Sequence, residues 1–168
     1  MAITRRTLLG AGVSTLAYAM NLRHAGAAAD FDDPARAVLT VTRNGERLGA
    51  FSRNDLVALP QTRISTCTPW AAAVMEYEGP PVAQFLSRFA VRAGQLRLLA
   101  LNDYLVTADA EMLIDGGAIL AIKENGAFMP ASSKGPVFVM FPFDSDPRLQ
   151  SQQYYARAVW QLIEIDVS

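Results

Sequence analysis

The chain has almost no histidine or cysteine. Its 168 residues include one histidine, His24, and one cysteine, Cys67. His24 lies in an N-terminal segment that we expect to be removed on export, which leaves the mature chain without an imidazole. A single cysteine excludes an internal disulfide and a cysteine-rich metal cluster. The lack of histidine excludes Ser-His-Asp and Cys-His catalysis and histidine-based zinc or iron sites.

The chain also lacks an excess of basic residues, with 15 lysines and arginines against 16 acidic residues. The whole chain has a formal net charge of −1. The first 29 residues hold Arg5, Arg6 and Arg23 and no acidic residue, so their removal takes the net charge to about −4. An acidic balance without a basic run argues against nucleic-acid binding.

Residues 1–29 have the features of an export signal. The twin arginines Arg5 and Arg6 precede an apolar run from Leu8 to Met20, and Ala27-Ala28-Ala29 offers small residues for cleavage. These features predict a twin-arginine (Tat) signal peptide and a periplasmic mature protein without direct membrane insertion. The apolar run is short and interrupted by glycine, which is too weak for a spanning helix. An uncleaved membrane anchor is the alternative.

Residues 30–168 are predicted to form a single domain of the α+β class. Alternating or apolar patterns predict strands at residues 37–43, 47–51, 63–68, 74–78, 96–101, 105–107, 118–123, 137–141 and 158–167. Short helices are predicted after Ser52, which has capping-box spacing to Asp55, and at residues 82–90 and 108–113. Asn44-Gly45 and Asn125-Gly126 predict hairpin turns, and residues 144–153 predict a polar loop. Many short strands with few helices indicate a mixed sheet core.

The stretch from Arg63 to Trp70 is the centre of the functional prediction. Its alternation predicts a strand with Ile64, Thr66 and Thr68 on one face and Ser65 and Cys67 on the other. Pro69 ends the strand, so Cys67, Thr68 and Trp70 are expected at a strand end, where ligands are commonly bound. We expect this loop to form one wall of a pocket for a flat heterocycle. A buried thiol beside a buried tryptophan is the alternative.

The order of the motifs resembles the sulfite-oxidase-type molybdopterin-binding fold. The matching segments are Leu59-Pro60, the strand ending at Cys67, Tyr77–Val82 with Phe85-Leu86, Leu101–Tyr104, Asn125-Gly126 with Met129-Pro130, Lys134–Val137 and Val159–Leu162. They cover nearly all of residues 36–167. The resemblance implies the mixed-sheet fold of that family, in whose enzymes a cysteine near the position of Cys67 ligates molybdenum.

The chain departs from the enzymes of that family at two positions. Lys134 stands immediately before Gly135, where a histidine is usual, and Val159 precedes Trp160, where the closing motif has a basic residue. The compact exported chain is more similar to the periplasmic pterin-response proteins of the PruR type. That resemblance implies a non-catalytic protein that binds reduced pterins. It also implies a partner, a membrane-bound diguanylate cyclase–phosphodiesterase of the GGDEF/EAL type, and hence a role in cyclic-di-GMP signalling and biofilm formation. The alternative is a molybdopterin-dependent oxidoreductase with Cys67 as the molybdenum ligand.

A pterin site needs aromatic surfaces for stacking and polar groups that read the edge of the ring. Trp70 and Tyr104 follow strand ends and are candidates for stacking, and Trp160 in the closing strand is a third. Asp103 is the candidate acceptor for the N–H groups of the ring, and Asn102 can donate or accept. Alternatively, Asp103 caps a hairpin turn and Trp160 is a core residue.

Two basic residues complete the predicted site. Lys134 has backbone donors nearby that suit a small anion. Arg157 is a candidate contact for an anionic ligand group or a partner protein, with an isolated surface arginine as the alternative. The Tyr154-Tyr155 pair is a candidate lid or partner surface, with an ordinary exposed loop as the alternative. The predicted pterin pocket therefore consists of Cys67, Thr68, Trp70, Asn102, Asp103, Tyr104, Lys134, Arg157 and Trp160.

Overall fold

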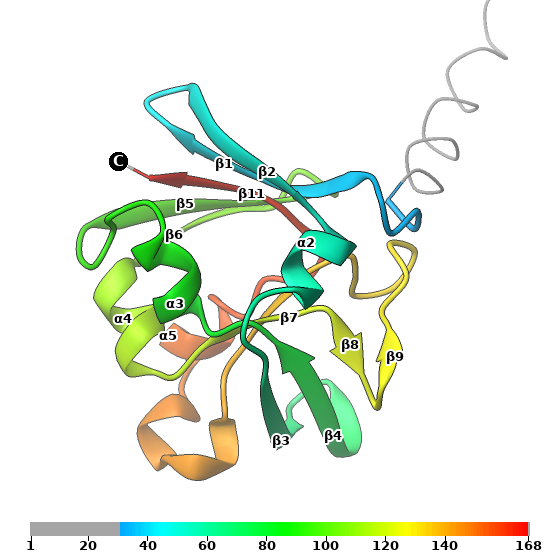
Figure 1. Cartoon of the computed structure of the whole chain (residues 1–168). Helices are drawn as coiled ribbons and strands as arrows, with labels where there is room; N and C mark the ends of the chain where they lie inside the picture. Colours follow the sequence, from blue (N-terminus) through cyan, green and yellow to red (C-terminus); the bar gives the residue numbers. More distant parts are fainter. Residues whose placement is uncertain (1–30, 168) are drawn as a thin grey trace, which may run out of the picture.

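The computed structural model describes residues 31–167 as three β-sheets with short helices around them (Figure 1). The expected export signal, residues 1–29, lies outside the described residues. The largest sheet has five strands in the order β2 (Glu46–Ser52), β1 (Ala37–Arg43), β11 (Leu162–Val167), β5 (Gln95–Ala100) and β6 (Leu105–Asp109). β1 and β11 run parallel, and the other neighbours are antiparallel. The prediction of an α+β class with a mixed sheet is confirmed.

The second sheet has four strands, in the order β3 (Thr62–Thr68), β4 (Ala71–Gly79), β8 (Lys123–Glu124) and β9 (Ala127–Phe128). The third is the pair β10 (Phe138–Met140) and β7 (Ile119–Ala121). Figure 1 shows the five-stranded sheet at the top, the four-stranded sheet at the bottom and β7 between them. The burial pattern of β3 confirms the predicted alternation, because Ile64, Thr66 and Thr68 are buried and the residues between them are exposed.

The end of β4 lies against the β7 segment with no room for a side chain at Gly79. The N–H of Leu120 donates to the Pro80 carbonyl at 2.9 Å, and that of Ile122 donates to the Glu78 carbonyl at 2.9 Å. A Cβ atom on Gly79 would lie 2.0 Å from the carbonyl oxygen of Leu120. Gly79 therefore permits the close backbone approach that joins the second and third sheets.

Within residues 31–167, four short α-helices connect the strands: α2 (Arg53–Val57), α3 (Val82–Ser87), α4 (Ala110–Asp115) and α5 (Gln152–Tyr155). The predicted capping box is present at α2. The Asp55 N–H donates to Ser52 Oγ at 3.1 Å, and Asp55 Oδ2 accepts from the Ser52 N–H at 2.8 Å. These bonds satisfy amide groups that the first turn of a helix leaves without partners.

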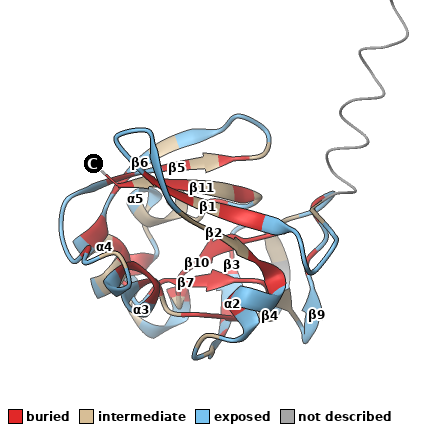
Figure 2. Cartoon of the chain, turned by 45° about the horizontal axis from the view of Figure 1, so that its top comes forward, coloured by how far each residue is buried: buried red, intermediate tan, exposed pale blue. Residues whose placement is uncertain are grey.

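The core lies between the sheets, where Figure 2 shows buried residues along β1, β11, β7 and β10. Fully buried large side chains include Leu39, Leu96 and Leu98 from the five-stranded sheet, Phe85 and Leu86 from α3, and Phe138 and Phe141 from the β10 segment. Among the described residues, no helix has the length and apolar character needed to cross a membrane.

Three predicted elements differ in the structure. The single strand predicted at residues 118–123 is divided into β7 and β8, which pair in different sheets. The polar loop predicted at residues 144–153 contains two 3-10 turns, η1 (Phe143–Ser145) and η2 (Pro147–Leu149), followed by the start of α5. The closing strand starts at Leu162, not at residue 158, because Trp160 and Gln161 form a turn in which Gln161 has a φ of 55°.

Two predicted helices are also placed differently. The helix predicted at residues 82–90 ends at Ser87, and Ala90 adopts a φ of 58° in the turn that follows. The helix predicted at residues 108–113 begins at Ala110, because β6 continues as far as Asp109. Both shifts concern the ends of elements, where local sequence patterns carry the least information.

Candidate ligand-binding site

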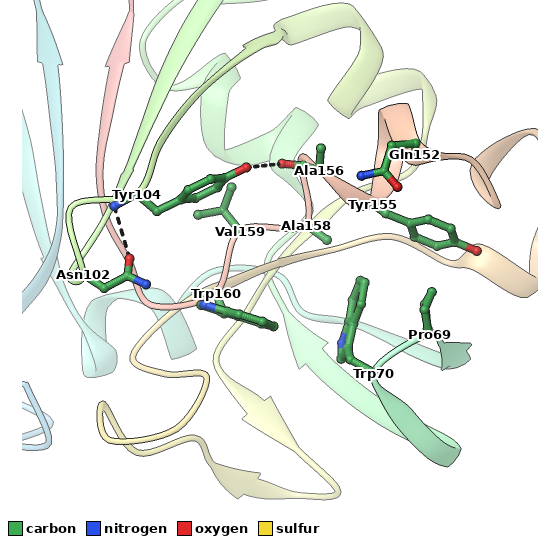
Figure 3. Close-up of a pocket in the computed structure, with 10 residues that line it drawn as sticks. All are labelled: Pro69, Trp70, Asn102, Tyr104, Gln152, Tyr155, Ala156, Ala158, Val159 and Trp160. Carbon is green, nitrogen blue, oxygen red and sulfur yellow. Dashed lines mark hydrogen bonds between the residues drawn. The ribbon is translucent and has the colours of Figure 1, made fainter.

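A cavity of about 400 Å³ is lined by three segments that lie far apart in the sequence (Figure 3). The β3–β4 turn contributes Pro69 and Trp70, the β5–β6 turn contributes Asn102 and Tyr104, and the segment from α5 to β11 contributes Gln152, Tyr155, Ala156, Ala158, Val159 and Trp160. Four of the lining residues are aromatic, and Figure 3 shows them arranged around one space. No acidic or basic side chain of residues 31–167 is among the lining groups.

The β3–β4 turn is fixed by contacts to η1. Thr68 pairs with Ala71, so Pro69 and Trp70 are the two residues of the turn. The ladder is irregular at Cys67, whose N–H donates to Asp144 Oδ2 at 2.6 Å instead of bonding across the sheet. This bond to a carboxylate ties the strand end to η1 and holds the turn that presents the indole to the cavity.

Trp70 is the centre of an aromatic cluster. Its ring makes edge-to-face contacts with Phe143, Tyr155 and Trp160, with centroid distances of 6.0, 6.0 and 6.4 Å. The Trp70 ring is half-buried, and its Nε1 atom is enclosed without a hydrogen-bond partner in the described part of the chain. Trp160 differs, because 42% of its surface is exposed. Trp70 therefore acts as a wall anchored in the core, whereas Trp160 offers an accessible ring face.

The side chain of Asn102 stabilises the β5–β6 turn from within. Asn102 Oδ1 accepts from the Tyr104 N–H at 3.2 Å, and the Ala100 N–H donates to the Tyr104 carbonyl at 2.8 Å. Asp103 occupies the tip of the turn with a φ of 64°, a conformation that Asn and Asp tolerate better than most residues. The Tyr104 hydroxyl donates to the Ala156 carbonyl at 3.2 Å, which joins the turn to the segment after α5.

Arg157 provides a second link between that segment and the five-stranded sheet. Its Nε donates to the Thr107 carbonyl at 3.2 Å, and its Nη1 donates to the Gln153 carbonyl at 3.3 Å. Thr107 belongs to β6, which is an edge strand with carbonyl groups that no further strand pairs. One guanidinium thus connects α5 to the edge of the sheet.

Four of the predicted site residues, Trp70, Asn102, Tyr104 and Trp160, line the same cavity. The other polar candidates near them do not. Cys67 is exposed on the outer face of β3, whereas Thr68 is buried on the inner face. Asp103 is exposed at the tip of the β5–β6 turn. These three residues flank the cavity without lining it.

Lys134 is also placed outside the lining. Its ammonium group forms an ion pair with Glu124 and lies 5.8 Å from the ring centre of Tyr77. Burial raises the pKa of the Tyr77 hydroxyl far above its usual range, and the Glu124 carboxylate raises it further. The Lys134 carbonyl accepts from the Gln161 N–H at 2.8 Å, which supports the turn carrying Trp160. Lys134 therefore contacts Glu124, Tyr77 and Gln161, which are not among the lining residues of the cavity.

Six lining residues were not among the predicted site residues: Pro69, Gln152, Tyr155, Ala156, Ala158 and Val159. Sequence carried a signal for one of them, because the Tyr154-Tyr155 pair stood out in a polar stretch. The structure separates the pair: Tyr155 lines the cavity, and Tyr154 packs on Phe141 with a centroid distance of 5.3 Å. The side chains of Ala156 and Ala158 have no functional group that could mark them as site residues in the sequence, and they contribute to the cavity by being small.

No group of three or more histidine, cysteine, aspartate and glutamate side chains within residues 31–167 is placed to hold a metal ion. No protein-family model matches the chain, and no curated protein is significantly similar to it. The aromatic, uncharged lining of the cavity is the feature of residues 31–167 that points to a ligand.

Proposed function

We propose that this chain is a non-catalytic periplasmic protein that binds a pterin in the cavity between Trp70, Tyr104, Tyr155 and Trp160. The observation that carries the proposal is an uncharged, aromatic cavity of about 400 Å³. Sites for small molecules commonly have volumes of about 300 to 1,000 Å³, an apolar lining and a few placed polar groups. A flat ring of neutral, amide-like character matches that combination.

The geometry of the lining supports stacking on Trp160. Its ring has an accessible face, and Trp70 stands nearly perpendicular to it at an interplanar angle of 87°. A planar ring stacked on Trp160 is therefore also nearly perpendicular to the Trp70 ring, and such edge-to-face contacts between aromatic rings are favourable. The side-chain amides of Asn102 and Gln152 provide hydrogen bonds at the periphery.

The lining does not fit molybdopterin. That cofactor carries a phosphate, and binding a phosphate in a desolvated site calls for several donors, usually including Arg or Lys. The described lining has no basic side chain, while Lys134 is paired with Glu124 and Arg157 is bonded to two backbone carbonyls. The Cys67 thiol lies on the exposed face of β3, outside the lining. We therefore favour a pterin without phosphate over the oxidoreductase alternative.

The wider role rests on the resemblance to sulfite-oxidase-type folds and to periplasmic pterin-response proteins. On that basis we propose the sulfite-oxidase-type fold for the α+β domain, and export through the Tat system. The proposed partner is the periplasmic part of a membrane-bound cyclic-di-GMP receptor of the GGDEF/EAL type. A bound pterin acts on such a partner only if it binds with different affinity to two states of the complex.

The test is a titration of the purified protein with tetrahydrobiopterin under reducing conditions. Tryptophan fluorescence is a direct reporter, because both tryptophans of the chain line the cavity. Trp160→Ala removes the stacking surface and is expected to weaken binding about tenfold or more, since stacking a base on an aromatic side chain contributes about 1–3 kcal/mol. Calorimetry measures the affinity of this variant, which lacks one fluorophore.

Phe128→Ala is the matched control. Phe128 is an aromatic residue of similar exposure, 41% against 42% for Trp160, and lies outside the lining. The Phe128→Ala variant should bind tetrahydrobiopterin with the same affinity as the wild type. Equal affinity of Trp160→Ala and the wild type would place the ligand elsewhere, and no binding by the wild type would overturn the proposal. Stoichiometric molybdenum in the purified protein, lost in Cys67→Ser, would instead establish the oxidoreductase.

A further inference from the structure

The structure holds the side-chain amide of Asn102 in one orientation. We infer that Asn102 determines which ring the cavity accepts, because it presents an N–H donor that selects a ring with a carbonyl oxygen. This inference rests on the proposed pterin-binding function and names the group of the ligand that Asn102 reads. Sequence alone left open whether Asn102 donates or accepts.

The hydrogen bond inside the turn fixes the direction of the amide. Oδ1 of Asn102 accepts from the Tyr104 N–H at 3.2 Å. Turning the amide over would place its NH₂ group against that N–H, so that two donors face each other and a hydrogen bond is lost. The Nδ2 atom is therefore the end of the amide that is left for a ligand.

Asn102 and Trp160 lie at the same end of the cavity. The Leu101 N–H donates to the Gln161 carbonyl at 2.8 Å, which places the β5–β6 turn beside the turn that carries Trp160. Figure 3 shows the Asn102 amide nitrogen directed to the side on which Trp160 lies. A ring stacked on Trp160 thus presents an edge to the Nδ2 donor.

Gln152 lies at the opposite end, beside Tyr155 (Figure 3). Its amide belongs to the first residue of α5 and, unlike that of Asn102, has no hydrogen bond to another of residues 31–167 that fixes its direction, so it can rotate to donate or accept. The selective contact is therefore at Asn102. A site built around a fixed donor discriminates strongly against a ring that places another donor there, since both groups are then left without partners.

Two rings of the same shape test this. Pterin has a carbonyl oxygen on its pyrimidine ring, and in its diaminopteridine analogue an amino group replaces that carbonyl. The wild-type protein is expected to bind pterin about tenfold or more tightly than the diamino analogue, the difference expected for one mispaired polar contact. Calorimetry of the purified protein with each compound gives the ratio.

Asn102→Asp is the informative variant, because it keeps the Oδ1 acceptor for the Tyr104 N–H and replaces the donor by a carboxylate oxygen. We expect the preference to reverse in favour of the diamino analogue. The double variant Asn102→Asp/Asp103→Asn restores the net charge of the turn and should keep the reversed preference. Thermal unfolding of each variant shows whether the turn is preserved. If Asn102→Asp does not fold, Asn102→Ser retains a side-chain acceptor and is expected to lose the preference without reversing it.

The outcomes separate the inference from the proposed function. Failure of the wild type to bind either ring overturns both. Binding of pterin with an unchanged preference in Asn102→Asp, or in Asn102→Ser where that variant stands in for it, overturns the inference alone and leaves the pterin site in place. Recovery of the wild-type preference in the double variant also overturns the inference, because it shows that added charge, and not the missing donor, caused the change.

Discussion

Replacing Arg157 by lysine tests whether this residue holds the cavity wall or binds an anionic ligand. The guanidinium bonds to two carbonyls on different elements, Thr107 on β6 and Gln153 in α5. Lysine keeps the positive charge but cannot form the fork that reaches both acceptors. Each bond from a charged donor in this half-buried position is worth about 1 kcal/mol. We therefore expect Arg157→Lys to lose about 1 kcal/mol of stability and Arg157→Leu about 2 kcal/mol.

Urea unfolding followed by tryptophan fluorescence measures these losses. A loss of 1 kcal/mol corresponds to a fall in melting temperature of about 3–4 °C for a domain of this size. Pterin affinity should fall in both variants because the wall that contains Tyr155 and Ala156 is less well held. The change of pterin affinity with salt concentration should be the same in both variants as in the wild type. Arg92→Lys, at an exposed arginine between α3 and β5, is the control and should be neutral.

The opposite pattern would refute the reasoning. If Arg157 contacts an anionic group of the ligand, lysine retains much of the affinity, leucine abolishes it, and binding weakens as salt rises. Stability would then be the same in both variants and the wild type. The comparison of stability with salt-dependent affinity distinguishes a structural link from a charge contact.

Substitutions at Gly79 and Glu78 test contacts that position the sheets. Gly79→Ala should destabilise the protein by about 3 kcal/mol or more, because its Cβ would lie 2.0 Å from the Leu120 carbonyl oxygen. Gly126 is the control, because it has a positive φ but open space around it, and Gly126→Ala should cost about 1 kcal/mol in the same urea experiment. Equal losses in the two variants would show that the close approach of Gly79 to Leu120 is not the cause. Hydrogen bonds from Lys123 and then Arg63 lower the pKa of Glu78. Their contribution to stability is therefore present above the unfolded-state pKa of about 4.3 and is lost as the pH falls through the lower folded-state value. The stability difference between the wild type and Glu78→Gln should consequently shrink between pH 7 and about pH 3, and a constant difference would show that the carboxylate charge is not responsible.

Local sequence signals predicted much of the secondary structure. Asn44-Gly45 and Asn125-Gly126 both form hairpin turns, with positive φ at all four residues. The requirement for positive φ is local, and Asn and Gly meet it in any context. The alternation along β3 and the capping box at Ser52 were predicted for the same reason, since each depends on residues that are neighbours in the sequence.

Non-local contacts set the elements that sequence missed. The division of residues 118–123 into β7 and β8 depends on which strands lie beside each half, β10 for one and β4 for the other. Trp160 leaves the predicted closing strand because the Gln161 amide donates to the carbonyls of Ala131 and Ser133, at 2.8 and 3.0 Å. Neither partner is visible in the local pattern of residues 158–167.

The candidate site shows the same division between local and non-local information. Aromatic residues at strand ends could be identified because their side chains are distinctive and their positions follow from the strand pattern. The ion pair of Lys134 and the hydrogen bond of Arg157 could not be predicted in this way, because their partners, Glu124 and the Thr107 carbonyl, lie ten and fifty residues away in sequence. Sequence identifies which charges exist, and the fold decides which of them are already paired.

The position of the cavity also links ligand binding to the arrangement of the sheets. One wall, at Trp70, lies in the β3–β4 turn, whose strand end is tied to η1 through the bond from Cys67 to Asp144, and another, at Asn102, lies in the β5–β6 turn of the five-stranded sheet. A ligand that contacts both walls binds only the arrangement in which they face each other. At a hundred times its dissociation constant, such a ligand stabilises that arrangement by about 2.7 kcal/mol. The side chains around the cavity mouth, including Tyr104 and Trp160, are exposed and belong to these same walls. The proposed signalling role therefore requires that the ligand bind with different affinity to two arrangements of these walls, so that its occupancy changes the surface offered to a partner.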